Sequence, residues 1–204
     1  MKIGIFGGTF DPIHNGHLYI ADNARKLQNL DRVIFVPTAN PPHKQNKLIT
    51  TPASRLEMCT LAIANNEYFE VSDIEVNRPG LSYTITTLNE LKASYGTRVQ
   101  LYFICGADML GDIPSWYLAQ EIVANYHIIA FPRPGFDMKS IVQQQQLLKE
   151  HSNNLILLDI MAVEISATLV RNSIKAGNSV KYLIPDQVIE YIQLHDLYSG
   201  RIRK

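Results

Sequence analysis

Short apolar runs alternate with longer amphipathic segments along this chain. The short runs end at glycine, proline or polar residues, which is typical of strands that are buried on both faces. They predict strands over residues 2–6, 32–36, 69–76, 99–105, 127–131 and 155–159. The longer segments repeat apolar residues three and four positions apart, as helices do. They predict helices over residues 15–28, 52–63, 82–95, 116–125, 166–176 and 185–194, and a more polar helix is expected over residues 137–150.

Three of the expected helix ends carry a chemical signal of their own. Thr51 suits the N-cap and Pro52 the first position of the helix that they precede. Gly96 suits the C-terminal end of the helix before it. Ser166 is a good N-cap for the late helix that starts there.

The order of these elements predicts the architecture. Strands that alternate with helices form a parallel sheet with helices on both faces, a doubly wound α/β fold, here followed by a small helical part. The 204 residues fit a single domain over 1–204, without an internal repeat or a flexible linker. Ligands of such folds bind outside the carboxyl ends of the strands. We therefore expect four loops that follow strands to converge on one crevice: residues 7–17, 38–44, 106–112 and 163–168.

The composition excludes several functional classes. Lys plus Arg and Asp plus Glu number 19 each, so the basic excess of proteins that wrap nucleic acids is missing and no nucleic-acid partner is expected. The chain shows neither a secretory signal nor an apolar segment long enough to span a bilayer, and no membrane partner is expected. Cys59 and Cys105 lie in apolar runs, which predicts buried thiols in a reducing compartment. We expect a cytoplasmic protein, and these patterns leave its oligomeric state open.

The first candidate for chemistry is the sequence GGTFDPIHNGH, which begins at Gly7. Two adjacent glycines after a buried strand let the backbone pass close to a phosphate or a ribose. The helix that follows starts with unpaired N–H groups, which favour anions. His14 and His17 are three residues apart and share one side of its first turn, and Gly16 between them leaves room for a ligand. The pattern predicts an anion clamp.

Other interpretations of this stretch are weaker. It lacks the G-x-G-x-x-G order of dinucleotide-binding loops, and no Gly-Lys-[Ser/Thr] of a P-loop exists in the chain. A His-x-x-His pair can bind zinc, but neither Asp11 nor Asp22 gives a recognised spacing for a further ligand. We therefore expect no metal site built from protein ligands alone.

A second candidate is the sequence ISATLVR, from Ile165 to Arg171. Its helix N-terminus carries the hydroxyls of Ser166 and Thr168 and is a potential anion site, within reach of the Arg171 side chain. The simpler alternative is an ordinary capped helix.

Together these segments resemble a known family. The stretch from Gly7 resembles the G-G-[ST]-F-D-P-x-H-x-G-H motif of bacterial nicotinate-nucleotide adenylyltransferases, and its H-x-G-H part is shared by the wider nucleotidyltransferase superfamily. ISATLVR resembles the element of that family that contacts ATP. The resemblance extends from Lys2 to Tyr198. It implies a Rossmann-like nucleotidyltransferase fold and an enzyme of NAD biosynthesis that joins AMP from ATP to nicotinate mononucleotide, giving deamido-NAD and pyrophosphate.

The resemblance also assigns roles to residues. It implies catalytic roles for His14, His17, Lys44 and Arg171. The residues that it implies for ATP are Gly7, Gly8, Thr9, Phe10, His14, His17, Gly106, Asp108, Ile165, Ser166, Thr168 and Arg171. Magnesium is expected to accompany ATP, carried mainly by phosphate oxygens and water.

Three further segments resemble the parts of the family that hold the second substrate. They are the loop TANPPHK from Thr38, the helix start SYTITTL from Ser82, and Trp116-Tyr117, where the family's tryptophan stacks on the nicotinate ring. The residues implied for nicotinate mononucleotide are Asn40, Lys44, Tyr83, Thr84, Trp116 and Tyr117.

Three alternatives remain open at this point. The same chemistry could act on nicotinamide mononucleotide, pantetheine phosphate or FMN. The chain could be a fragment of a class I aminoacyl-tRNA synthetase, although it is short and neutral. It could also be a dinucleotide-binding or redox module without catalysis, although G-x-G-x-x-G is missing.

Overall fold

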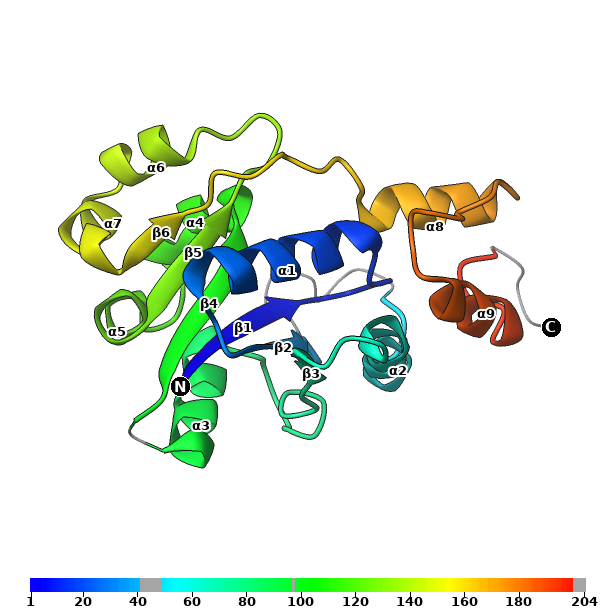
Figure 1. Cartoon of the computed structure of the whole chain (residues 1–204), viewed down its shortest axis with the longest axis horizontal. Helices are drawn as coiled ribbons and strands as arrows, with labels where there is room; N and C mark the ends of the chain where they lie inside the picture. Colours follow the sequence, from blue (N-terminus) through cyan, green and yellow to red (C-terminus); the bar gives the residue numbers. More distant parts are fainter. Residues whose placement is uncertain (41–48, 97, 200–204) are drawn as a thin grey trace.

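The computed structural model describes residues 1–40, 49–96 and 98–199, and its centre is one parallel sheet (Figure 1). All neighbouring strands pair in parallel, in the order β3-β2-β1-β4-β5-β6. The strands are β1 Lys2–Gly8, β2 Arg32–Pro37, β3 Phe69–Val71, β4 Gln100–Gly106, β5 His127–Phe131 and β6 Leu155–Leu157. The order of the strands reverses between β1 and β4, and a crevice at their carboxyl ends is therefore the expected place for a ligand.

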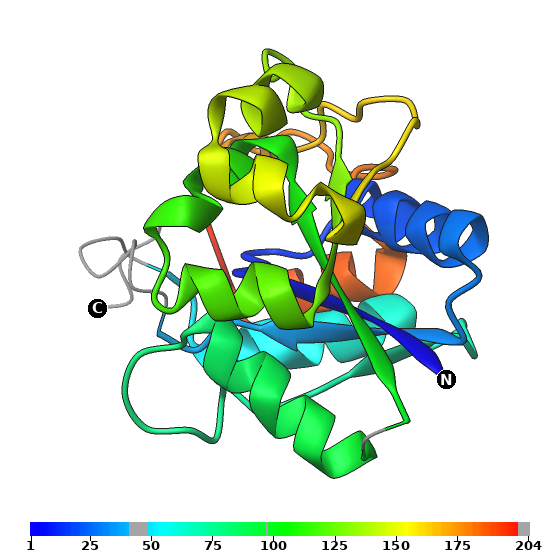
Figure 2. The same ribbon diagram turned by 90° about the vertical axis from the view of Figure 1, so that its left-hand side faces the viewer.

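Helices cover both faces of the sheet, which confirms the doubly wound α/β prediction. The helices are α1 Asn15–Gln28, α2 Pro52–Ile63, α3 Thr84–Tyr95, α4 Ala107–Asp112, α5 Ala119–Asn125, α6 Met138–Gln144, α7 Gln146–Glu150, α8 Ala167–Lys175 and α9 Asp186–Leu194. Short 3₁₀ turns lie at η2 Ile113–Ser115 and η3 Ser152–Asn154. Figure 2 shows α1 and α3 on opposite sides of the sheet. In Figure 1, α8 and α9 lie beyond the carboxyl end of β1 and form the small helical part.

Two apolar cores, one on each face, hold these layers together. One core contains Phe6 and Phe35 of the sheet with buried residues of α1, α2, α8 and α9. The other contains Ile3 and Ile5 with buried residues of α3, α4, α5 and α7. Alternate residues of β1 thus face opposite cores, which explains why the run is apolar throughout.

The predicted helix ends are confirmed where a cap was recognised. Thr51 Oγ1 accepts a hydrogen bond from the Ser54 N–H at 3.2 Å, and Ser166 Oγ accepts one from the Leu169 N–H at 3.1 Å. Gly96 ends α3 with a φ of 83°, a conformation that favours glycine.

Several predicted boundaries were wrong. The strand expected over 69–76 ends at Val71, because residues 74–77 form a turn in which the Asn77 N–H bonds the Asp73 carbonyl at 3.0 Å. The helix expected from Trp116 begins at Ala119, because the Trp116 N–H closes the preceding 3₁₀ turn. The helix expected over 137–150 is divided into α6 and α7, because Gln145 has an extended backbone.

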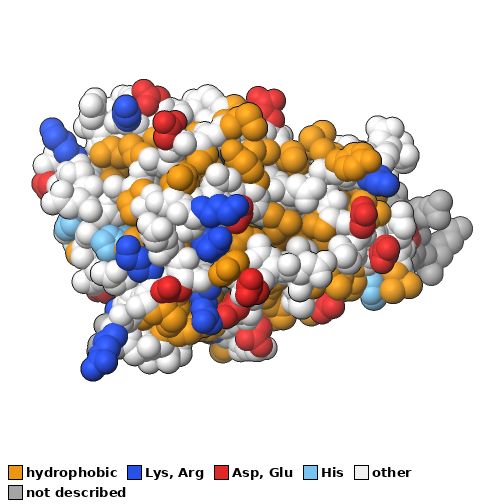
Figure 3. Space-filling model, in the orientation of Figure 1, with side chains coloured by type: hydrophobic (Ala, Val, Ile, Leu, Met, Phe, Trp, Pro, Cys, Tyr) orange, Lys and Arg blue, Asp and Glu red, His pale blue; other side chains and the backbone are white. Residues whose placement is uncertain are grey.

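The surface and the thiols agree with the composition. Cys59 and Cys105 are both buried and unbonded to each other, as predicted. Figure 3 shows basic and acidic side chains interspersed over the visible face, without a large patch of one sign. Among the described residues, no helix is both long enough and apolar enough to cross a membrane.

Candidate active site

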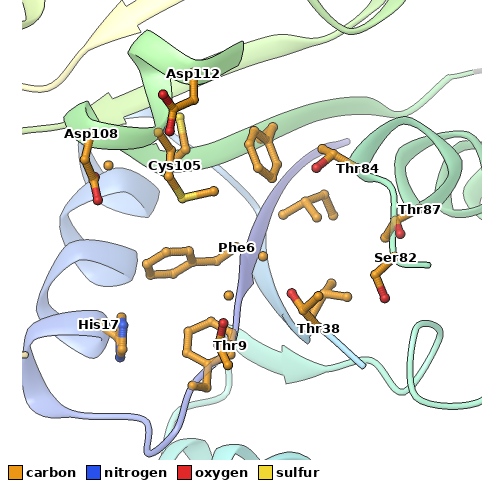
Figure 4. A pocket seen from close by; sticks show the side chains of 18 of the residues that line it. Phe6, Thr9, His17, Thr38, Ser82, Thr84, Thr87, Cys105, Asp108 and Asp112 are labelled. Carbon is orange, nitrogen blue, oxygen red and sulfur yellow. The ribbon is translucent and has the colours of Figure 1, made fainter. Parts of the chain in front are cut away.

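A cavity of about 830 Å³ opens at the carboxyl ends of β1 and β4. The loops that follow β1 and β4 line it together with the start of α8, which confirms the predicted convergence of three loops. The fourth, expected over 38–44, reaches the cavity at Thr38, and its residues 41–44 lie outside the described residues. The predicted site residues that line it are Gly7, Gly8, Thr9, Phe10, His14, His17, Tyr83, Thr84, Gly106, Asp108, Trp116, Tyr117, Ser166, Thr168 and Arg171. In Figure 4, His17 and Thr9 lie on one side of it, across from Ser82, Thr84 and Thr87.

Two of the predicted site residues that the structure describes do not line the cavity, and a third is not described. Ile165 precedes the Ser166 cap and is not among the lining residues. Asn40 is exposed and also does not line the cavity. Its backbone pairs with Ser82 instead, in hydrogen bonds of 3.3 Å to the Ser82 Oγ and 3.1 Å from the Ser82 N–H. Lys44 lies outside the described residues.

The histidine pair is packed as a single unit at the start of α1. The rings of His14 and His17 stack with centroids 3.5 Å apart and planes 20° from parallel. The backbone N–H of His14 donates to His17 Nδ1 at 3.2 Å. The rings of Phe10 and His17 make an edge-to-face contact with centroids 4.9 Å apart. Backbone and ring contacts together therefore fix the direction in which both imidazoles point.

Both imidazoles are neutral at physiological pH, a property that the predicted anion clamp left open. Burial, and then the charge of Arg133, lowers the pKa of His14 to about 3. The pKa of His17 is also well below its usual value, because of burial first and then of His14 and Arg133. Neutral imidazoles act toward a phosphate as N–H donors, and the positive charge of the described cavity wall comes from Arg133 and Arg171.

Gly16 serves the histidine pair rather than a ligand. A Cβ at this position would lie 3.0 Å from His14 Nδ1 and 3.3 Å from Val163 Cγ1. The expectation that Gly16 leaves room for a ligand is therefore wrong, since the His14 ring takes that space.

Arg171 is held at the rim of the cavity by two hydrogen bonds. Its Nη1 donates to the Asp11 carbonyl at 2.7 Å and its Nη2 to Thr168 Oγ1 at 3.2 Å. These bonds join the start of α8 to the loop after β1, so that the two predicted motifs form one wall.

Arg133 is a second cation in the cavity, and the sequence interpretation missed it. It follows β5, and its Nε lies 3.7 Å from Asp108 Oδ1 in an ion pair. Its charge lowers the pKa of both histidines, and its side chain lines the same cavity. No role was assigned from the sequence to the segment that follows Phe131. Its position just after the carboxyl end of a strand in the interior of the sheet was the signal that could have identified Arg133.

Aromatic side chains form another part of the wall. Trp116 lines the cavity and packs edge-on against Phe103, with ring centroids 5.9 Å apart. Tyr83 and Tyr117 approach each other with centroids 4.8 Å apart. A flat ligand would find apolar ring surfaces here, beside the N-terminus of α3.

Comparison with known proteins gives a consistent result. Residues 5–173 match the family model described as cytidylyltransferase-like. A probable nicotinate-nucleotide adenylyltransferase of Desulfitobacterium hafniense is 43% identical over 198 residues, which cover 97% of this chain and 95% of the relative. A relative of the same name from Clostridium perfringens is 42% identical, with 97% of this chain and 98% of the relative covered.

The chain belongs to the nicotinate-nucleotide adenylyltransferase family.

Solved structures share the fold. The structure of Plasmodium falciparum nicotinic acid mononucleotide adenylyltransferase complexed with NaAD has a TM-score of 0.80 at 24% identity, and the match covers 98% of both chains. A second structure of that protein, complexed with APC, has a TM-score of 0.76 with the same identity and coverage. The Rossmann-like architecture of nicotinate-nucleotide adenylyltransferases is therefore also the architecture of this chain.

A buried arginine supports the loops of this nicotinate-nucleotide adenylyltransferase fold. Arg55 of α2 is only 1% exposed. Its guanidinium donates to the carbonyls of Thr9 at 2.7 Å, Thr50 at 2.9 Å and Ala39 at 3.4 Å. One side chain thus joins the loops after β1 and β2. A single arginine among the apolar positions of the helix was the signal for it, and the sequence interpretation did not use it.

The end of the described chain also reaches the first motif. The Tyr198 hydroxyl donates to Asp11 Oδ1 at 2.6 Å. Burial, and then the charge of Asp11, raises the pKa of this tyrosine. The hydroxyl therefore stays protonated as a donor, and Asp11 is held from two directions, by Tyr198 at its carboxylate and by Arg171 at its carbonyl.

Proposed function

We propose that this chain transfers the AMP part of ATP to nicotinate mononucleotide, giving deamido-NAD and pyrophosphate. The observation that carries the proposal is one cavity with two unlike walls. The His14–His17 pair, Arg171 and the N-terminus of α8 suit a triphosphate, and the aromatic wall at Trp116 suits a pyridine ring. Full-length relatives of this chain are named for the same reaction.

The reaction requires the protein to align its two substrates rather than to transfer a proton. The 5′-phosphate of the acceptor is an anion at neutral pH and attacks the α-phosphorus of ATP in line, while pyrophosphate leaves. No catalytic base is needed, so catalysis consists of positioning two anions and stabilising the charge that develops. His14 and His17 would donate N–H groups to the α-phosphate and the bridging oxygen.

Two arginines would supply the positive charge. Arg171 and the hydroxyls of Ser166 and Thr168 would hold the β- and γ-phosphates, at a helix N-terminus that favours anions. Arg133 would leave its 3.7 Å ion pair with Asp108 for the triphosphate, since a phosphate carries more charge than one carboxylate. Lys44 remains a prediction for screening the incoming phosphate.

Magnesium would arrive with ATP. Among residues 1–40, 49–96 and 98–199, no group of three or more His, Cys, Asp or Glu side chains is arranged to hold a metal ion. Asp108 and Asp112 do line the cavity and offer single carboxylates. This donor set fits a metal held mainly by phosphate oxygens and water, which would supply charge neutralisation on the triphosphate.

The acceptor would lie against the aromatic wall. Trp116 would stack on the nicotinate ring, flanked by Tyr83 and Tyr117. The ring's carboxylate would meet the N–H groups at the start of α3, near Thr84. Asn40 would act only through its backbone pairing with Ser82.

Acceptor-dependent pyrophosphate release tests this proposal. The protein is incubated with ATP and magnesium, and release is followed with nicotinate mononucleotide or nicotinamide mononucleotide, with an acceptor-free control. We expect faster release with nicotinate mononucleotide, together with deamido-NAD. Equal use of both acceptors would contradict the specificity, and release with neither would contradict the reaction.

A further inference from the structure

One buried carboxylate lines the cavity without a part in the chemistry described above. Glu75 lies in the turn after β3 and is only 6% exposed. It is among the residues that line the cavity. Its Oε2 is buried and has no hydrogen-bond partner in the part of the chain that the structure describes.

The other carboxylate oxygen is fixed in place. The Thr87 hydroxyl of α3 donates to Glu75 Oε1 at 2.7 Å. Arg78 donates to Thr87 Oγ1 at 2.8 Å and lies 3.9 Å from Glu75 Oε1. Arg78 is itself held by Glu90 at 2.7 Å. The carboxylate is therefore anchored through Oε1. The Ser82 hydroxyl is near enough to lower the pKa of the carboxyl, but Oε2 has no hydrogen bond within 3.5 Å among the described residues and keeps its capacity to accept.

An unpaired buried oxygen is costly for the folded protein. Burial raises the pKa of Glu75, and the hydroxyls of Thr87 and Ser82 and the charge of Arg78 oppose that effect. A donor that enters the cavity would replace the hydration that the carboxylate lost on folding. The free oxygen is thus a place where a ligand gains more than it would on an exposed carboxylate.

The location of Glu75 limits which hydrogen-bond donor of a ligand can reach its Oε2. Its partner Thr87 lies beside Ser82 and Thr84, across the cavity from His17 and Asp108 (Figure 4). This is the side where the proposed function places the acceptor nucleotide. Once its phosphate is fully ionised, nicotinate mononucleotide has hydrogen-bond donors only at its two ribose hydroxyls, because its ring carboxylate and phosphate only accept.

We propose that Glu75 Oε2 accepts a hydrogen bond from a ribose hydroxyl of the acceptor mononucleotide. Glu75 is then a substrate-binding residue that recognises the sugar, separately from the wall that recognises the pyridine ring. The inference rests on the proposed function, since it takes nicotinate mononucleotide as the acceptor.

Deoxy analogues of the acceptor test the contact in the intact protein. We would measure kcat/KM for nicotinate mononucleotide and its 2′-deoxy and 3′-deoxy analogues at pH 8. For the unmodified protein we expect a loss of about tenfold or more with one analogue, as for a hydrogen bond to a charged group. Equal use of all three acceptors would overturn the proposal without any variant having to fold.

The variant Glu75→Gln completes a double-mutant cycle, in which the protein group and the substrate hydroxyl are removed separately and together. It should lose a similar factor with nicotinate mononucleotide, keep its KM for ATP, and show little further loss with the analogue that the unmodified protein discriminates against. Glu90→Gln is the matched control, because Glu90 also pairs with Arg78 but does not line the cavity, and it should keep the discrimination. If the loss caused by Glu75→Gln and the loss caused by the deoxy analogue multiply when both changes are combined, the proposal is overturned. Failure of the unmodified protein to use nicotinate mononucleotide at all would instead contradict the proposed function.

Discussion

The histidines that carry the proposed chemistry act as neutral donors in a cavity that also contains Arg133 and Arg171. His14 and His17 were recognisable in the sequence from their spacing behind two glycines. Their protonation state was not, because it depends on burial and on Arg133, which is more than a hundred residues away in the chain. Spacing predicts which side chains meet, and only the packed structure gives the electrostatic field that they experience.

Replacement of one histidine tests the proposed role of the pair as hydrogen-bond donors to the reacting phosphate. We expect His17→Ala to lower the rate of pyrophosphate release by more than tenfold, because a positioned donor to the reacting phosphate is lost, with the fold intact. Steady-state kinetics and circular dichroism measure the two effects. His151→Ala is the control, since His151 is not among the residues that line the cavity and its replacement should keep the rate. Near-normal turnover of His17→Ala would contradict the assignment.

The lowered pKa values also predict how stability depends on pH. Between the ordinary histidine pKa of about 6.5 and the native His14 value of about 3, the unfolded chain binds protons that the native protein does not. The free energy of unfolding therefore falls as pH decreases below about 6.5. We expect His14→Asn to show a shallower fall between about pH 7 and pH 5.5 in urea titrations. An unchanged slope in the variant would show that His14 is not held neutral.

At the scale of elements, the sequence predicted well the helix ends that depend on neighbouring residues, and poorly the features that depend on tertiary packing. The caps at Thr51 and Ser166 placed α2 and α8 correctly, because a cap is decided by neighbours within one turn. The division of the helix expected over 137–150 was not predictable, because no glycine or proline interrupts the segment and the extended backbone of Gln145 is seen only in the structure. The loops that follow the strands predicted the location of the site, because the carboxyl ends of parallel strands lie at the same edge of the sheet.

The buried Arg55 makes a prediction for the elements that it joins. Arg55→Met should lower the free energy of unfolding by about 2–4 kcal/mol, because the carbonyls of Thr9, Thr50 and Ala39 lose a charged donor. The rate should fall as well, because the loops after β1 and β2 lose their common support. Urea denaturation and steady-state kinetics measure these effects.

An exposed ion pair provides the comparison. Arg32 pairs with Glu70 at the sheet edge, and both side chains are more than a third exposed. Arg32→Met should therefore change stability by no more than about 1 kcal/mol. Equal effects of the two substitutions would contradict a supporting role for Arg55.

At the scale of the whole molecule, the cavity depends on segments from both ends of the sequence. The loop after β1 is held by Arg55 of α2, Arg171 of α8 and Tyr198 near the C-terminus. The family resemblance included Tyr198 without giving it a role, since its bond to Asp11 spans 187 positions in the chain. Motifs predicted which loops meet, and the bonds that hold them together appear only in the folded chain.

The transfer of label from the α-phosphate of ATP tests the central claim most directly. The protein is incubated with magnesium, nicotinate mononucleotide and ATP labelled at the α-phosphorus, and the products are separated. Attack on the α-phosphorus predicts label in deamido-NAD and unlabelled pyrophosphate, at equal molar yields. Absence of label from any dinucleotide, or its release in a product other than deamido-NAD, would contradict the assignment of this chain as a nicotinate-nucleotide adenylyltransferase.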